Sequence, residues 1–180
     1  MSTKKIVITG GPGTGKSSII NALTAKGYTC LEEISRQVTL DAREEGIEQL
    51  FLTKPLLFSE RLLEGRKKQY FEADTLKQNW VFLDRGLPDV LAYMDYSGDD
   101  YPRQFRTDCE SMPYDTVFIL KPWKAIYQSD AVRYENFDQA LQIHNALVKT
   151  YETFNYNLLD VPFDTIDNRA EYILKVIQAM

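Results

Sequence analysis

This chain of 180 residues has few histidines and cysteines, and it has no excess of basic charge. His144 is the only histidine, so a metal site built from several histidines is excluded. Cys30 and Cys109 are the only cysteines, and they lie too far apart for a zinc knuckle, so we expect reduced thiols. The formal net charge is −5, whereas a nucleic-acid binder needs a basic surface to neutralise phosphates. We therefore expect no nucleic-acid partner.

Long apolar segments are also absent from the sequence. The residues after Met1 lead directly into a short predicted strand, without the apolar run of a secretory signal. No other apolar run approaches the roughly 20 residues that cross a bilayer. These absences predict a cytoplasmic protein that does not enter a membrane.

What the chain does contain is the composition of a globular domain. Hydrophobic residues make up 44% and charged residues 26% of the sequence, as in ordinary soluble proteins. The length favours one domain, and no repeat, linker or low-complexity segment divides the chain. We predict a single domain over residues 1–180.

Short apolar runs alternate with helical segments along the whole chain. The runs predicted as strands are residues 5–9, 28–31, 80–83, 116–120 and 158–160. The segments predicted as helices are 16–26, 34–49, 53–78, 88–96, 136–156 and a last helix capped by Asp167. Residues 97–113 fit neither pattern and are predicted as a loop with at most a helical turn. The alternation is typical of an α/β fold, in which helices cover both faces of a parallel sheet.

The predicted helix at 53–78 has a recognisable start and a sided pattern. Thr53 can cap its first turn, because a threonine hydroxyl accepts a backbone hydrogen bond there. Apolar residues recur on one stripe, which is the predicted buried face: Leu56, Leu63 and Tyr70. The charged run at 66–68 is therefore expected to face solvent.

Residues 10–17 match the phosphate-loop pattern G-x-x-x-x-G-K-[ST] between a predicted strand and a predicted helix. The glycines let successive backbone N–H groups turn toward phosphate oxygens, and the helix directs its positive dipole end to the same place. Lys16 adds a full positive charge, and Ser17 offers a hydroxyl to Mg²⁺. The residues predicted to bind the nucleotide phosphates are Gly11, Gly13, Thr14, Gly15, Lys16, Ser17 and Ser18.

Two charged residues follow the predicted strand at 80–83, at the sheet edge where α/β proteins bind ligands. Asp84 is predicted to support Mg²⁺ together with Ser17. Arg85 stands where hydrolytic ATPases commonly have a glutamate that orients water. Because arginine holds anionic or hydroxylated groups and does not act as a base, Arg85 favours transfer to a bound acceptor over hydrolysis. The alternative is a structural ion pair between Asp84 and Arg85.

A kinase also needs a carboxylate near the acceptor hydroxyl. Glu32 and Glu33 follow the second predicted strand, and either could serve, with a solvated acidic turn as the alternative. Residues 122–136 form a polar segment between a strand and a helix, predicted as a small lid in which Arg133 stabilises the transferring phosphoryl group. Asp89 is expected to bind the acceptor or to cap its own helix. Five aromatic residues could stack on an acceptor ring or belong to the core: Phe51, Phe58, Tyr70, Phe71 and Tyr93.

Together the segments 10–17, 33–36, 84–89 and 133–135 resemble a family of small P-loop proteins. These proteins are catalogued as AAA-type ATPase domains, and they look closer to the ribosylnicotinamide kinase domain and to nucleoside and nucleotide kinases than to ring-forming machines. The resemblance spans nearly the whole chain. It implies a P-loop NTPase fold of three layers with a five-stranded parallel sheet in the order 2-3-1-4-5. It also implies Mg²⁺ with ATP or GTP. It implies catalytic roles for Glu33, Asp84, Arg85 and Arg133, and with Lys16 of the phosphate loop these are the predicted catalytic residues.

We therefore predict a small-molecule kinase that is a monomer or a homodimer. It would move the γ-phosphoryl group of ATP, or of GTP, to a hydroxyl of a nucleoside-like or other polar metabolite. The alternative is a nucleotide-binding regulator or slow hydrolase that acts through a partner protein. A switch GTPase is disfavoured, because the guanine-reading Asn-Lys-x-Asp pattern is absent.

Overall fold

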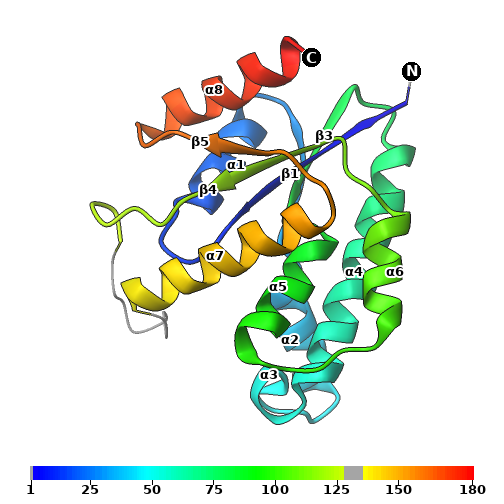
Figure 1. Ribbon diagram of the computed structural model, residues 1–180. Coiled ribbons are helices and arrows are strands. Elements are labelled where there is room, and N and C mark those ends of the chain that lie inside the picture. Colours follow the sequence, from blue (N-terminus) through cyan, green and yellow to red (C-terminus); the bar gives the residue numbers. More distant parts are fainter. Residues whose placement is uncertain (1, 128–135) are drawn as a thin grey trace.

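The computed structural model describes residues 2–127 and 136–180, and this part of the chain forms five strands and eight helices (Figure 1). The strands are β1 (Lys4–Gly10), β2 (Thr29–Leu31), β3 (Trp80–Asp84), β4 (Thr116–Leu120) and β5 (Leu158–Val161). The helices are α1 (Lys16–Ala25), α2 (Ser35–Glu44), α3 (Leu50–Thr53), α4 (Pro55–Thr75), α5 (Leu87–Ser97), α6 (Arg103–Ser111), α7 (Phe137–Thr153) and α8 (Ile166–Gln178). The strands pair in parallel in the order β2-β3-β1-β4-β5, so the predicted sheet and its strand order are confirmed.

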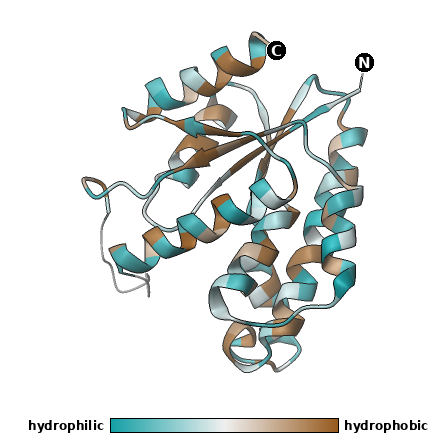
Figure 2. Cartoon of the chain, viewed as in Figure 1, coloured by the Kyte–Doolittle hydropathy of each residue, from teal (hydrophilic) through white to brown (hydrophobic). Residues whose placement is uncertain are grey.

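Helices cover both faces of this sheet, as the three-layer prediction requires. Successive strand side chains point to opposite faces, so β1 contributes to both cores. Ile6 and Ile8 pack with side chains of α1 and α8, whereas Val7 packs with the helices of the opposite layer. In Figure 1, α8 and α1 lie on one side of the strands, and α4, α5, α6 and α7 lie on the other. The strands are accordingly hydrophobic, while many helix positions are hydrophilic (Figure 2).

The parallel topology determines where the polar loops meet. Ile8 of β1 pairs with Asp84 at the end of β3, and Leu31 at the end of β2 pairs with Leu83. The loops that follow these three strands therefore leave the sheet at one carboxyl edge. The phosphate loop, the segment after β2 and the segment after β3 are thus neighbours in space.

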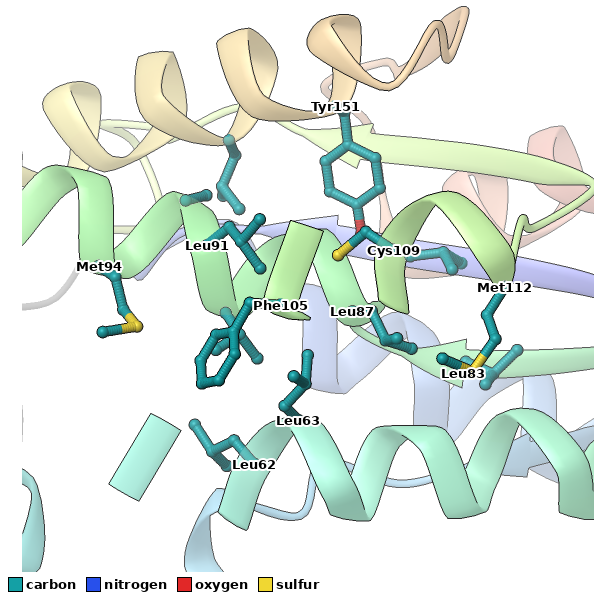
Figure 3. Close-up of a cluster of buried hydrophobic side chains, with 14 of the residues drawn as sticks. Leu62, Leu63, Leu83, Leu87, Leu91, Met94, Phe105, Cys109, Met112 and Tyr151 are labelled. Carbon is teal, nitrogen blue, oxygen red and sulfur yellow. The ribbon is translucent and has the colours of Figure 1, made fainter. Parts of the chain in front are cut away.

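The nine-residue helix α6 was not expected, because residues 103–111 are mostly polar and were predicted as loop. Phe105 and Cys109 are 5% and 2% exposed, and they lie one helical turn apart. Figure 3 shows both side chains in the cluster that also contains Leu63 and Leu87. Packing against α4 and α5 therefore stabilises a helix that local propensity does not predict.

Two predicted helix starts were wrong, and one predicted helix face was right only in part. Thr53 ends α3, and Lys54 precedes α4, so Thr53 does not cap the long helix. The hydroxyl of Thr165 accepts the capping hydrogen bond of α8 from the Asn168 amide at 3.3 Å, and Asp167 lies in the first turn instead. On the predicted buried stripe, Leu63 is buried as expected, but Leu56 is 40% exposed, and Arg66, which was predicted to face solvent, is only 3% exposed. Among the described residues, no helix combines the length and the apolar character needed to cross a membrane.

Candidate functional site

The phosphate loop adopts the backbone conformation that its glycines predict. Gly13 and Gly15 have φ angles of 73° and 77°, in the left-handed region that side-chain-bearing residues rarely adopt. The Thr14 hydroxyl donates a hydrogen bond of 3.0 Å to the Gly11 carbonyl and closes the turn. Helix α1 begins at Lys16, so the loop and the helix N-terminus face the same space.

That space is a cavity of about 730 Å³. The phosphate loop from Gly11 to Ser18 forms one part of its wall. The polar side chains opposite include Glu33, Arg66 and Arg85, from the β2–α2 loop, from α4 and from the end of β3. Apolar side chains form a further wall: Phe51, Phe58, Leu62, Val90, Tyr93 and Met94. The cavity therefore has a phosphate end and an aromatic end.

Lys16 and Asp84 form a buried ion pair at the phosphate end. The two residues are 8% and 5% exposed. Burial and the nearby Arg85 charge lower the pKa of Lys16, although Asp84 opposes this shift. The lysine charge is thus already balanced by a carboxylate that a bound phosphate could replace.

Glu33 is the centre of the charged group opposite the loop. Its carboxylate accepts a hydrogen bond from Arg66 Nη2 at 3.3 Å and pairs with Arg85 Nε at 2.6 Å. The backbone amides of Ile34 and Ser35 also donate to it, at 2.9 and 3.1 Å. Burial alone would raise the pKa of Glu33, but the charges of both arginines and of Lys16 lower it to about 2. Glu33 is therefore an anion across the physiological pH range.

Asp89 holds Arg85 in place and is itself completely buried. Its carboxylate accepts hydrogen bonds from Thr9 Oγ1 and Tyr151 Oη, both at 2.5 Å. It also accepts the Gly86 amide at 2.9 Å, which caps α5, and it pairs with Arg85 Nη1 at 3.1 Å. Of the two predicted roles for Asp89, the structure shows the helix cap.

The predicted metal residues fit Mg²⁺ by their chemistry. Ser17 is exposed at the start of α1 and lines the cavity, and Asp84 at the end of β3 pairs with Lys16, the residue before Ser17. A hydroxyl and a carboxylate are hard oxygen donors, and Mg²⁺ commonly takes only one or two protein ligands and completes its shell with phosphates and water. The described residues contain no group of three His, Cys, Asp or Glu side chains that could hold a metal alone. Such a site suits a metal that arrives with a nucleotide.

The structure distinguishes between alternatives that the sequence left open. Glu33 lines the cavity, whereas Glu32 is exposed and is not among the cavity-lining residues; its carbonyl accepts a hydrogen bond from Gln69 at 2.7 Å. The proposed Asp84–Arg85 ion pair is not formed, because each of these residues pairs with another partner.

The aromatic residues predicted for an acceptor pocket are only partly in the cavity, and the predicted lid lies mostly outside the described residues. Three of the five aromatic candidates line the cavity, namely Phe51, Phe58 and Tyr93. Tyr70 packs on Phe71 and Tyr114 elsewhere, and Phe71 is 57% exposed. Arg133, with most of the predicted lid at 122–136, lies outside the described residues.

Arg66 is a cavity-lining candidate that the sequence alone did not indicate. It donates to the Gly86 carbonyl at 3.1 Å as well as to Glu33, and so joins the β2 and β3 loops. Its spacing from Leu62, Leu63 and Gln69 places it on the buried stripe of α4, and this helical periodicity was the signal available in the sequence.

The fold and the loop define the class of this protein, a P-loop nucleotide-binding domain with the strand order β2-β3-β1-β4-β5. Residues 5–169 match the family model described as AAA domain, and the chain belongs to this family. A comparison with curated proteins finds no match.

Several solved structures share the fold at low sequence identity. A deoxyadenosine kinase from M. mycoides superposes with a TM-score of 0.67 at 17% identity, over 98% of this chain and 100% of that chain. NadR protein in complex with NR superposes with a TM-score of 0.70 at 15% identity, over 98% of this chain and 50% of that chain. Thymidylate kinase from Candida albicans gives 0.63 at 16% identity, over 99% of this chain and 92% of that chain. The chain thus shares its fold with these three proteins.

Proposed function

We propose that this protein is a kinase that transfers the γ-phosphoryl group of ATP, or of GTP, to a hydroxyl of a nucleoside-like metabolite. The observation that carries the proposal is the position of Glu33 and Arg85 in the same cavity as the phosphate loop. A carboxylate held as an anion opposite the donor phosphates is what a hydroxyl acceptor requires. The resemblance of the fold to nucleoside and nucleotide kinases supports the same class of reaction.

The donor end would be formed by the phosphate loop. Its backbone N–H groups and the N-terminus of α1 would bind the phosphate oxygens, and Lys16 would turn from Asp84 to the β- and γ-phosphates. Ser17 and Asp84 would hold Mg²⁺, which when bound with the nucleotide neutralises charge on the phosphates.

The acceptor end would bind a flat ring and a hydroxyl. Phe51, Phe58 and Tyr93 offer aromatic surfaces, and the Tyr93 ring centroid lies 5.2 Å from the guanidinium carbon of Arg85. Glu33 would accept a hydrogen bond from the hydroxyl and orient its oxygen toward the donor. A carboxylate with a pKa of about 2 is a weak base, so Glu33 would take the hydroxyl proton only as the hydroxyl oxygen bonds to the γ-phosphorus and the bond from that phosphorus to the leaving diphosphate breaks.

The test is turnover of ATP with Mg²⁺, with and without a panel of nucleosides that includes nicotinamide riboside. We expect one acceptor to raise ADP formation strongly and to yield a product heavier by one phosphoryl group. Arg85→Ala should impair this transfer and spare ATP affinity, because Arg85 pairs with Glu33 and not with the loop. Slow turnover that no acceptor changes would instead support the alternative, a nucleotide-binding regulator or slow hydrolase.

A further inference from the structure

Arg169 in the first turns of α8 is buried directly behind the phosphate loop. It is 1% exposed and is the largest fully buried side chain among the described residues. Its Nη1 donates a hydrogen bond of 3.0 Å to the carbonyl of Thr14. The guanidinium carbon lies 5.9 Å from the ring centroid of Trp123, which itself stacks on Phe163. Arg169 therefore contacts the loop but is not among the residues that line the cavity.

The charge of this arginine is not balanced by the described part of the protein. No carboxylate of the described residues forms an ion pair with Arg169, in contrast to Arg66 and Arg85. Its Nε and Nη2 atoms are buried and have no hydrogen-bond partner there. Burial without a neighbouring anion lowers the pKa of Arg169, although an arginine stays charged in proteins. An uncompensated buried cation lowers the stability of the fold, and this one lies next to the predicted phosphate site.

The contact with Thr14 explains how Arg169 can act without touching a ligand. No peptide bond in the described residues is cis, so the Thr14 carbonyl and the Gly15 N–H point in opposite directions across one peptide plane. Because Arg169 holds the carbonyl from behind, the Gly15 N–H is turned toward the cavity side of the loop. A charged donor on the carbonyl also polarises the peptide and makes that N–H a stronger donor.

We propose that Arg169 is a positioning residue of the donor site, which orients and polarises the Thr14–Gly15 peptide and whose charge is balanced by the phosphates of the bound nucleotide. This inference rests on the proposed donor site and assigns a role to a residue outside the phosphate-loop motif. Gly15 is part of the same arrangement, because a Cβ at this position would lie 3.0 Å from Arg169 Nη1. A glycine is thus needed there both for its positive φ and for the approach of the guanidinium.

Three variants separate the charge, the hydrogen bond and a merely structural role. Arg169→Gln keeps an amide donor for Thr14 but removes the charge, and Arg169→Met removes both. Arg106→Gln is the matched control, because Arg106 is exposed on α6 and lies over the Phe154 ring, away from the loop. The measurements are the dissociation constants of Mg·ATP and Mg·ADP by calorimetry and the unfolding temperature without nucleotide.

We expect Arg169→Met to weaken ATP binding about tenfold or more, with a smaller loss for Arg169→Gln and none for Arg106→Gln. The loss should be larger for ATP than for ADP, since ATP brings more negative charge to the loop. The unfolding temperature without nucleotide should not fall, because the substitution removes an unpaired buried cation.

Unchanged ATP affinity in Arg169→Met would overturn the inference and leave the kinase proposal intact. Equal losses for ATP and ADP together with a lower unfolding temperature would also overturn it, since they indicate a structural role. If the unmodified protein binds no triphosphate, the donor site itself is wrong and both proposals fail.

Discussion

At the residue scale, the site is a compact arrangement of alternating charges. Glu33 lies between Arg66 and Arg85, and Asp89 holds Arg85 from the other side. Removing one member of such a buried group leaves its partner charged and unpaired, which costs more than the pair contributes. The ionisation of Glu33 is consequently linked to the stability of the fold.

The pH dependence of stability tests this link. The pKa of Glu33 is about 2 in the folded protein, below its ordinary value of 4.5. Its contribution to the free energy of unfolding is therefore complete above about pH 4.5 and is lost as the pH falls from there through about 2. We expect the difference in unfolding free energy between the unmodified protein and Glu33→Gln to shrink over this range, as measured by urea denaturation.

Glu45→Gln is the control for this measurement, because Glu45 pairs with Arg61 at the surface. We expect it to change the unfolding free energy by less than about 1 kcal/mol at every pH. A Glu33→Gln difference that stays constant down to about pH 2 would contradict the lowered pKa.

At the element scale, the junction from β3 to α5 positions the charge of Arg85 in the candidate site. Arg85 has a φ of 77°, which is unusual for a residue with a side chain, and its amide donates to the Ile8 carbonyl at 3.1 Å. The strained turn is held by the Asp89 cap at Gly86 and points the Arg85 side chain back at Glu33. The turn therefore depends on close packing around Gly86.

Gly86→Ala tests that packing. The backbone of Gly86 is extended, so alanine is allowed conformationally, but a Cβ would lie 2.8 Å from Tyr151 Oη and 2.9 Å from Tyr114 Cε2. We expect a loss of about 1–3 kcal/mol in unfolding free energy from overpacking, measured by denaturant unfolding. The control is Gly98→Ala at the end of α5, where space is open and only the positive φ is strained. A smaller loss at Gly86 than at Gly98 would show that the junction can relax.

At the scale of the whole molecule, one sheet joins two hydrophobic cores. Each core takes alternate side chains from the same strands. If one layer of helices separated, it would expose one face of the sheet against whose other face the second layer packs. The site lies at the carboxyl edge of this sheet, on loops from β1, β2 and β3. A ligand that bridges these loops should stabilise the entire fold as a unit.

Thermal unfolding with Mg·ATP measures this coupling. At a ligand concentration 100 times the dissociation constant, binding adds about 2.7 kcal/mol to the unfolding free energy. We expect a clear rise in unfolding temperature for the unmodified protein and none for Lys16→Ala, since Lys16 is the loop's cation. Lys4→Ala is the control, because this lysine pairs with Asp115 at the opposite end of β1. An unchanged ATP shift in folded Lys16→Ala would refute the assignment of the phosphate site.

The sequence by itself determined the parts of the protein that depend on near neighbours along the chain. The β-branched run of β1 and the apolar run of β4 predict buried strands, and the glycine pattern at 10–17 predicts its own backbone turns. Their alternation with helices was enough to predict a parallel sheet, because parallel strands need crossover connections, whereas the strand order came from the resemblance to small P-loop proteins. These features arise from steric preference and hydrophobic period, both of which act over a few residues.

Only the tertiary structure decided which polar residues lie in or beside the candidate site. Contacts between segments far apart in the chain distinguish Glu33 from Glu32. Such contacts also reveal Arg66 and Arg169. The helix α6 likewise exists because Phe105 and Cys109 reach a core that other helices supply. The physical reason is the same for these residues and for α6. Burial and charge balance depend on the groups that the folded chain places opposite a side chain, and the local sequence does not identify those groups.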